Sequence, residues 1–399
     1  MFDQWLRRHD PDQVFLMGGE GELTFGQALE RMRKAETASV VNLTPTLDFN
    51  SIVAISSAMS TGTALLSGPG QAMPTTADPG SAVTVVLTSG SSGAPKAVRH
   101  SAENWLAAAE ASQAHLGNDS DDVWLLAMPL YHVGGLSIVV RSAYTGGAVR
   151  LLPEFEPSTF AAALRGNVTM ASVVPTMLSR LLDHDPGPYE GLRAVLVGGG
   201  PIPDGLLERA SAARIPALPT YGMTETCGQV ATLRPGSVID AKADPLPGVE
   251  LRIEPDGRIA LRCPMLSPGY LGEPDRAGGD WFVTNDLGAL DPDGALRVWG
   301  RADTVIMTGG EKVVPEVVEG ALKRVEGVED ALVVGVAHGD WGEEVCCVYV
   351  GDVDAGILDS ELRRSLPTFM IPKRWVGVDH IPVAGPGKPD RDRAKRYFN

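Results

Sequence analysis

Hydrophobic runs rich in β-branched residues alternate with amphipathic segments from residue 81 onward. The runs predict buried strands at 83–87, 123–128, 148–152, 170–174 and 194–197. Helical spacing of apolar positions predicts helices between them, at 103–116 and 160–164. This alternation is typical of an α/β protein whose parallel sheet is covered by helices on both faces.

The pattern differs on either side of this region. Before residue 81 it predicts two helices, at 25–36 and 50–60, and then a linker rich in Gly, Pro and Thr. Past residue 249, short alternating segments separated by Asp-Gly turns predict a small antiparallel β subdomain. We expect one large domain over residues 1–302.

Another change of pattern comes at Asp303. Beyond it the sequence predicts a helix at 315–325, strands at 331–337 and 345–350, and a helix at 359–366. About a hundred residues suffice for an independent α+β domain. We therefore expect a small C-terminal domain over residues 303–399.

Composition and charge exclude several classes of function. The 399 residues are 44% hydrophobic and 21% charged, as in ordinary globular proteins. The net charge of −16 argues against partners that are themselves polyanionic, namely nucleic acid and anionic membranes. The N-terminus lacks the apolar core of a secretory signal, and the four cysteines show no CxxC spacing. We expect a cytoplasmic protein without membrane insertion, zinc site or disulfides.

A loop of small residues directly follows the first of these strands. It offers glycines that let a phosphate approach the backbone, hydroxyl groups that donate hydrogen bonds, and a lysine. Its candidate phosphate-binding residues are Thr88, Ser89, Gly90, Ser91, Ser92, Gly93 and Lys96. Pro95 and Ala97 depart from the Walker spacing, so a Ras-like or ATPase-like fold is not expected.

Two further loops follow later strands. One contains Gly199, Gly200 and Pro201, and the other is Tyr221-Gly222-Met223-Thr224-Glu225. If all three loops end strands of one sheet, they converge on one crevice, where open α/β sheets bind ligands. Tyr221 then offers a flat face to a base, Thr224 a hydroxyl to a phosphate and Glu225 an oxygen to Mg²⁺. The alternatives are a plain turn for the glycines and a solvated charge for Glu225.

The three loops together resemble those of the acyl-adenylate-forming (AMP-binding) superfamily. The resemblance extends through 284–288, 300–319 and 387–391, so that five motifs occur in the family's order over residues 81–391. It implies an acid-thiol ligase with a mobile C-terminal domain. A substrate carboxylate attacks the α-phosphate of Mg-ATP, and the thiol of CoA then captures the acyl group from the acyl-adenylate. The cofactors and co-substrates implied are ATP, Mg²⁺ and CoA.

The resemblance also implies roles for individual residues. Lys388 is the catalytic lysine of the adenylation step, and it acts with Thr224 and the magnesium ligand Glu225. Asp286 and Arg301 bind the ribose. Asp303 is the hinge between the domains, and Gly309 and Gly310 line the thiol tunnel. If the other motifs were absent, Asp286 would be interpreted as an ordinary turn residue and Lys388 as a solvated lysine of the C-terminal tail.

The acid substrate is indicated by a narrower resemblance. The segments PLYHVGGLS and VLVGGGPIP, with Arg141 and the short overall length, look like bacterial o-succinylbenzoate–CoA ligases of menaquinone biosynthesis. This implies an aromatic dicarboxylate whose second carboxylate needs a partner, for which His132 and Arg141 are the candidates. For Arg141, an equal alternative to substrate binding is a cation that faces water at a helix end. For His132, the alternative is a purely structural role. Residues 1–80 depart from longer family members, so no role is carried over there.

Three other functions stay open. Within the same fold the chain is a ligase for another aryl or acyl acid, or an adenylation enzyme that loads a carrier protein in place of free CoA. A nucleotide-binding regulator without catalysis is disfavoured by Lys388. The resemblance leaves a homodimer open.

Overall fold

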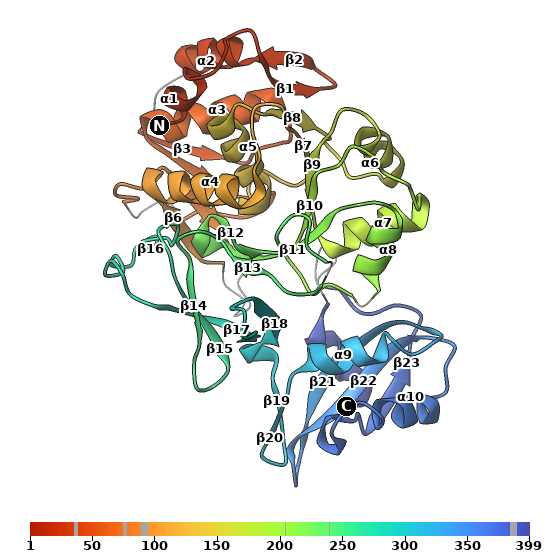
Figure 1. Ribbon diagram of the computed structural model, residues 1–399. Helices are drawn as coiled ribbons and strands as arrows, with labels where there is room; N and C mark the ends of the chain where they lie inside the picture. Colours follow the sequence, from red (N-terminus) through yellow and green to blue (C-terminus); the bar gives the residue numbers. More distant parts are fainter. Residues whose placement is uncertain (36–38, 75–77, 89–94, 204, 239, 384–388) are drawn as a thin grey trace.

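The computed structural model describes residues 1–399 except 36–38, 75–77, 89–94, 204, 239 and 384–388 (Figure 1). A nine-stranded sheet forms its centre. In spatial order the strands are β13 (Asp244–Pro245), β12 (Gly228–Thr232), β11 (Ala217–Met223), β10 (Ala194–Val197), β9 (Met170–Val173), β7 (Val123–Leu126), β8 (Ala148–Leu151), β1 (Val14–Gly18) and β2 (Gly21–Thr24). The strands from β11 to β1 run parallel, and antiparallel strands flank them at both edges.

A second sheet has five strands. Their order is β16 (Gly269–Tyr270), β6 (Ala97–His100), β5 (Thr84–Leu87), β4 (Thr63–Leu66) and β3 (Val40–Leu43). β3, β4 and β5 are parallel, whereas β5 with β6 and β6 with β16 are antiparallel. The sheet therefore combines a parallel half with an antiparallel half that begins at the predicted phosphate loop.

Helices cover the central sheet on both faces (Figure 1). One core unites the sheet with α1 (Phe2–Leu6), α2 (Phe25–Lys34), α3 (Phe49–Thr61), α4 (Ala102–Leu116) and α5 (Val133–Thr145), and the other with α6 (Pro157–Leu164), α7 (Pro175–His184) and α8 (Leu206–Ala212). Two aromatic side chains, Trp105 and Trp124, are completely buried in the first core. Burial on both faces explains why these strands are continuous apolar runs.

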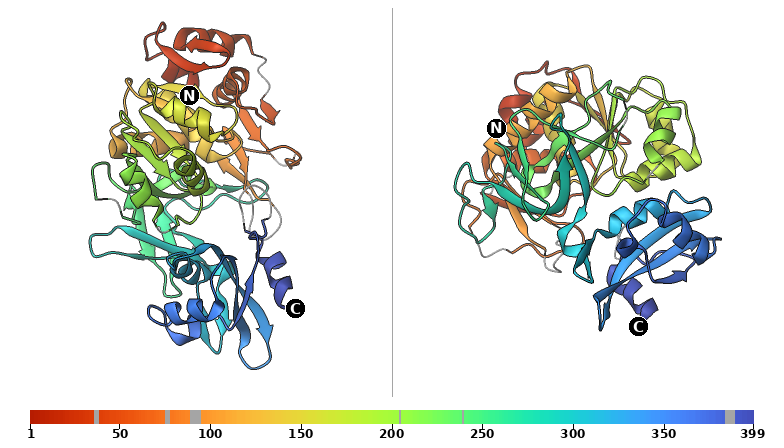
Figure 2. Two further views of the ribbon diagram at one scale, coloured as in Figure 1. Left: turned by 90° about the vertical axis from the view of Figure 1, so that its right-hand side faces the viewer. Right: turned by 60° about the horizontal axis from the view of Figure 1, so that its bottom comes forward.

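An antiparallel sheet and a small lobe complete the chain. The sheet order is β14 (Glu250–Ile253), β15 (Arg258–Arg262), β17 (Phe282–Leu290) and β18 (Leu296–Arg301), followed by the short helix η2 (Ala302–Thr304). The lobe contains β19 (Ile306–Thr308), β20 (Glu311–Val313), α9 (Pro315–Leu322), β21 (Val328–His338), β22 (Gly342–Gly351), α10 (Ala355–Leu362), β23 (Arg374–Gly377) and α11 (Arg391–Lys395). Its apolar clusters draw only on residues after Asp303, and it stands apart from the rest of the chain in two orientations (Figure 2).

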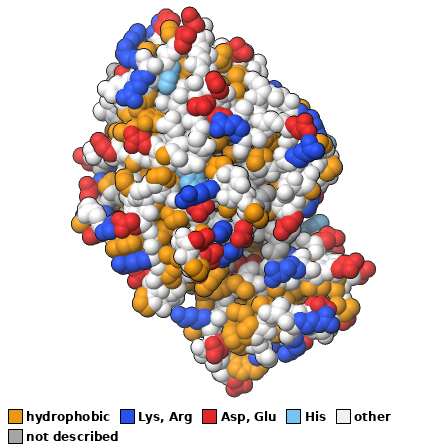
Figure 3. Space-filling view, in the orientation of Figure 1, with side chains coloured by type: hydrophobic (Ala, Val, Ile, Leu, Met, Phe, Trp, Pro, Cys, Tyr) orange, Lys and Arg blue, Asp and Glu red, His pale blue; other side chains and the backbone are white. Residues whose placement is uncertain are grey.

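The sequence predicted most of these elements. All five strands of the α/β region are present, as are the helices of residues 25–36 and 50–60. Among the described residues, no helix is both long and apolar enough to cross a bilayer. The four cysteines are free thiols. Acidic and basic side chains are interspersed over the face shown in Figure 3.

The expectation that the three loops end strands of one sheet was wrong. The chain returns from the phosphate loop as strand β6, and α4 begins after it with Ser101 as its N-cap. Moreover, β5 belongs to the five-stranded sheet, while β10 and β11 belong to the central one. The three loops therefore do not end strands of one sheet, because a sheet with an antiparallel return strand carries the first of them.

Candidate active site

Three residues predicted to bind the nucleoside meet at one point. The Tyr221 hydroxyl donates to Oδ2 of Asp286 at 2.7 Å, and Nη1 of Arg301 donates to its Oδ1 at 3.2 Å. Asp286 and Arg301 are directly opposite each other in the β17–β18 ladder. Burial and the Asp286 carboxylate raise the pKa of Tyr221, so it stays a phenol. Each carboxylate oxygen retains a lone pair for a ribose hydroxyl.

Arg301 also reaches the predicted hinge. Its Nε and Nη2 donate to the two carboxylate oxygens of Asp303 at 2.9 and 3.0 Å. Hydrogen bonding to Asp303 is the main cause of the raised pKa of Arg301. One guanidinium thus joins the Asp286 carboxylate to that of Asp303.

Thr224 is held through its backbone by a buried chain of hydrogen bonds. Nε2 of His100 lies 2.7 Å from the Thr224 carbonyl oxygen, and Nδ1 lies 3.1 Å from Oγ1 of Thr84. Trp105 donates to the same Thr84 oxygen at 2.9 Å. A carbonyl oxygen only accepts, so the network assigns the proton to Nε2. Burial lowers the pKa of His100 to about 4, which keeps the ring neutral.

Glu225 has one carboxylate oxygen engaged. The Tyr270 hydroxyl donates to its Oε1 at 2.8 Å, and Nζ of Lys96 lies 4.8 Å from the centre of the Tyr270 ring. Within the described part of the chain, no group of three or more His, Cys, Asp or Glu side chains is arranged to hold a metal ion. A single carboxylate suits Mg²⁺, which takes its other ligands from nucleotide phosphates and water.

Gly222 and Gly199, one in each of two predicted loops, have structural reasons to be glycine. A Cβ atom on Gly222 would lie 1.9 Å from the Gly228 carbonyl oxygen, so the close approach of β11 to β12 requires glycine. Gly199, Gly200 and Pro201 are exposed beyond β10, and Gly199 has a φ of +79°. Ser89, Gly90, Ser91, Ser92, Gly93 and Lys388 lie outside the described residues.

His132 and Arg141 do not share a face of α5. His132 is the exposed N-cap residue, whose pKa is lowered because neighbouring protein atoms reduce its hydration. Arg141 lies nine positions further on, about 13.5 Å along the helix axis. The alternative that Arg141 faces water is wrong, since its side chain is buried inside the helix packing. The two residues therefore cannot bind the same carboxylate group.

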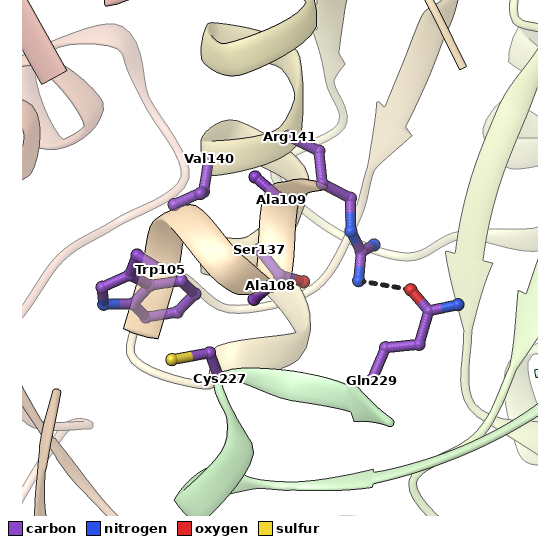
Figure 4. A pocket seen from close by; sticks show the side chains of 8 residues that line it. All are labelled: Trp105, Ala108, Ala109, Ser137, Val140, Arg141, Cys227 and Gln229. Carbon is purple, nitrogen blue, oxygen red and sulfur yellow. Dashed lines mark hydrogen bonds between the residues drawn. The ribbon is translucent and has the colours of Figure 1, made fainter. Parts of the chain in front are cut away.

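Arg141 lines a narrow pocket between α4, α5 and β12 (Figure 4). The gap is too tight to admit a water molecule in this conformation, and it is lined by Trp105, Ala108, Ala109, Ser137, Val140, Arg141, Cys227 and Gln229. Nη2 of Arg141 donates to Oε1 of Gln229 at 3.1 Å. Burial alone lowers the pKa of Arg141, to about 10, and no carboxylate of the described chain pairs with it. A buried guanidinium without a counter-ion favours the binding of an anion.

The predicted thiol-tunnel glycines lie at the β19–β20 turn. Gly309 and Gly310 have φ of +59° and +87°, and the Gly309 N–H donates to the Trp341 carbonyl oxygen at 2.9 Å. The Trp341 ring is 37% exposed, stacks on His338 and has Nζ of Lys373 over its face. In Figure 1 the tip of this hairpin points away from β11, so the two glycines do not line the nucleotide corner in this conformation.

Comparison with known proteins assigns the chain to a family. The AMP-binding enzyme family matches residues 22–271, and its C-terminal domain matches residues 317–388. The chain belongs to the AMP-binding enzyme family. A similar relative, the 2-succinylbenzoate–CoA ligase of Listeria innocua serovar 6a, is 36% identical over 328 residues, which cover 79% of this chain and 70% of that protein.

Solved structures of this family agree with the fold. The o-succinylbenzoate CoA synthetase (MenE) of Bacillus subtilis, in complex with the acyl-adenylate OSB-AMP, superimposes with a TM-score of 0.87 at 26% identity, covering 99% of this chain and 97% of the other. Its complex with ATP and magnesium ion gives a TM-score of 0.86 at 25% identity and covers 99% of each chain. The predicted superfamily and fold class are confirmed.

Sequence reasoning missed four residues that contact predicted site residues: His100, Gln229, Tyr270 and Trp341. His100 and Tyr270 stand in short strands, where nothing local distinguishes them from core residues. Gln229 follows the recognised Tyr221–Thr226 motif by three positions. This proximity to the motif is the one feature of the sequence that could have identified Gln229 as a candidate site residue.

Proposed function

We propose that this chain is an ATP-dependent acid-thiol ligase that joins 2-succinylbenzoate to CoA through an acyl-adenylate. Family membership, the named relatives and the B. subtilis complexes with the acyl-adenylate and with ATP and magnesium ion support the reaction type. The product, 2-succinylbenzoyl-CoA, belongs to menaquinone biosynthesis.

The buried Arg141 is the observation that carries the choice of acid. A substrate with two carboxylates keeps one negative charge after the other is activated, and that charge needs a buried partner. Arg141 offers one, because it stays charged at neutral pH and has no acidic neighbour among the described residues. Gln229 orients it, and Ser112 in turn donates to Gln229 at 3.1 Å. A monocarboxylic acid would leave this guanidinium uncompensated.

The nucleotide-binding residues act as positioning and charge-stabilising groups. In this proposal Tyr221, Asp286 and Arg301 bind the adenosine, while Lys96 and the hydroxyls of residues 88–92 bind the β- and γ-phosphates. Glu225 would hold Mg²⁺, which when bound spreads the phosphate charge. The acid carboxylate then attacks the α-phosphorus in line, and pyrophosphate leaves.

Lys388 is the proposed catalytic cation of this first step. Positive charge beside the α-phosphate stabilises the negative charge that develops during the attack. Three residues later, Arg391 forms ion pairs with Glu316 and Glu319 of α9 at 2.8 and 2.5 Å. This anchor fixes the chain that follows Lys388 to the small lobe, so movement of the lobe would carry the lysine with it.

For the second step we propose that residues 303–399 rotate as a domain about Asp303 relative to residues 1–302. The rotation would withdraw Lys388 and bring Gly309 and Gly310 to the acyl-adenylate, where they would line the path of the thiol. Beside Gly309, the Trp341 ring is covered by His338 and by the ammonium group of Lys373, so that Lys373 presents a cation to an incoming nucleotide.

Mass spectrometry of the products from ATP, CoA and a panel of acids tests this function. We expect 2-succinylbenzoyl-CoA, AMP and pyrophosphate. If only a different acid gives a CoA ester, 2-succinylbenzoate is refuted as the substrate, and the assignment as an acid-thiol ligase stands. Transfer of the acyl group to a carrier protein but not to CoA would indicate a carrier-loading enzyme. The proposal also includes a cytoplasmic location, and light scattering of the purified chain tests whether it forms a homodimer.

A further inference from the structure

Tyr270 contacts two of the groups proposed to bind Mg-ATP. Its hydroxyl donates to Oε1 of Glu225 at 2.8 Å, while the ammonium group of Lys96 lies 4.8 Å from its ring centre. The guanidinium of Arg276 lies 5.8 Å from the same ring. Glu225 and Lys96 are 129 positions apart in the chain, so one side chain links two distant parts of the site.

The backbone around Tyr270 is fixed to both of these parts. In the β16–β6 ladder Tyr270 lies opposite Val98, and the Leu271 N–H donates to the Ala97 carbonyl oxygen at 2.8 Å. On the other side, the Ser267 N–H donates to the Glu225 carbonyl oxygen at 2.7 Å. The Ser267 hydroxyl donates to the Arg99 carbonyl oxygen at 2.6 Å. Tyr270 is therefore held between the return strand of the phosphate loop and the Thr224–Thr226 turn.

The chemistry of a phenol suits this position. It has a single O–H, so it engages one oxygen of Glu225 and leaves the other free to ligate a metal. A phenol keeps its proton at neutral pH, so the hydroxyl is a hydrogen-bond donor to this carboxylate. The face of the ring attracts the Lys96 ammonium group without neutralising its charge.

We propose that Tyr270 is a positioning residue for Mg-ATP, which turns the free oxygen of Glu225 toward the metal and orients Lys96 toward the phosphates. Ligating carboxylates are commonly oriented by a second hydrogen-bonding group. The inference rests on the proposed function in one respect only, that ATP and Mg²⁺ bind at this site. It is independent of the acid.

Tyr270→Phe separates the two contacts, because it removes the hydroxyl and keeps the ring under Lys96. Binding of Mn²⁺ can be followed by electron paramagnetic resonance in the presence of α,β-methylene-ATP, without any acid. We expect Mn²⁺ affinity to fall by about threefold to tenfold, the size of one hydrogen bond to a charged group partly replaced by water. Binding of the nucleotide analogue in EDTA should stay unchanged, which also shows that the variant is folded.

Two comparisons distinguish positioning from a structural role. In a Glu225→Gln background, Tyr270→Phe should cause no further loss of Mn²⁺ affinity, because the group that it orients no longer carries the charge. The matched control is Tyr144→Phe, since Tyr144 donates to Glu110 at 3.4 Å on the surface of α4 and α5. That variant should bind Mn²⁺ as the wild type does.

Unchanged Mn²⁺ affinity in Tyr270→Phe, or equal losses with and without Glu225→Gln, would overturn the inference. Because no acid is present, failure of the chain to ligate 2-succinylbenzoate would refute the proposed function and leave this result standing.

Discussion

Two buried basic side chains, one on each side of the candidate site, deal with burial in opposite ways. His100, on the nucleotide side, has a pKa lowered to about 4 and hydrogen-bond partners at both ring nitrogens. Arg141, the proposed partner of the acid, has a pKa of about 10, so it keeps its charge at neutral pH. The proposed nucleotide-binding residues pair with one another, whereas no carboxylate of the described residues pairs with Arg141.

The proposed nucleotide-binding and acid-binding residues also differ in how their charges are paired. The Asp286 carboxylate is already paired with Arg301, and Arg301 with Asp303, before any nucleotide is present. Arg141 has the neutral amide of Gln229 as a hydrogen-bond partner and the ring of Trp124, whose centre lies 5.5 Å from its guanidinium carbon. We infer that the nucleotide corner is preorganised, while the acid pocket contributes specificity through a charge that only the right ligand satisfies.

Arg141→Met should produce the largest effect. It removes the proposed partner of the second carboxylate, and we expect kcat/KM for 2-succinylbenzoate to fall by about 100-fold or more, as for loss of one member of a buried charge pair. Kinetics at varied acid and fixed ATP measure this. The melting temperature should not fall, because an uncompensated buried charge is replaced by an apolar side chain.

An unchanged KM for the acid in Arg141→Met would mean that Arg141 does not bind the acid. Arg141→Lys is the conservative control, which keeps the charge and loses the forked geometry, and it should recover part of the activity.

Asp286→Ala tests the other side. It removes the carboxylate that would bind the ribose diol and leaves Arg301 without one of its partners. We expect kcat/KM for ATP to fall by about 10- to 100-fold, the size of one or two hydrogen bonds to a charged group, with little change in the KM for the acid. Equal losses for both substrates would argue against a separate nucleotide corner.

The neutral state of His100 predicts a specific pH dependence of stability. Unfolded His100 binds its proton near pH 6.5, whereas the folded protein binds it only near pH 4. Between these values the unfolded state holds more protons, so the stability that this group contributes falls as the pH falls. At pH 5.5 the loss is about 1.4 kcal/mol, or tenfold in the unfolding constant.

Urea unfolding of the wild type and of His100→Gln, at pH 7.5 and pH 5.5, isolates this contribution. The difference in stability between the two proteins should shrink at the lower pH. A difference that does not depend on pH would mean that His100 is not buried as a neutral ring.

His132→Ala should have the smallest effect on catalysis. Because His132 is exposed and lies on another face of α5 than Arg141, we expect the KM for the acid to rise about fivefold, as for one neutral hydrogen bond. The KM for ATP should not change. An effect as large as that of Arg141→Met would mean that the acid carboxylate lies at the start of α5.

The sequence was sufficient where one pattern determined one structure. Continuous apolar runs predicted the buried strands, and the motifs predicted that Tyr221, Asp286 and Arg301 belong together. It was insufficient where partners come from different sheets. The pairing of Tyr270 with Glu225 depends on β16 joining β6, and two-residue strands leave no periodic pattern.

The burial of Arg141 is a second feature that the sequence could not predict. Apolar residues such as Val139 and Val140 precede it on α5, yet the sequence alone left water and substrate as equal alternatives for its side chain. Only the packing of α5 against α4 and β12 decides that the guanidinium is buried. The predicted domain boundary at Asp303 and the role of Lys388 stay predictions.

In the proposed function, Arg141 selects an acid with a second carboxylate. The direct measurement compares kcat/KM for 2-succinylbenzoate and for 4-oxo-4-phenylbutanoate, which lacks the carboxylate on the ring, in the wild type and in Arg141→Met. We predict that the wild type prefers the dicarboxylate by about 100-fold and that the variant loses this preference. The same preference in both proteins would contradict the claim.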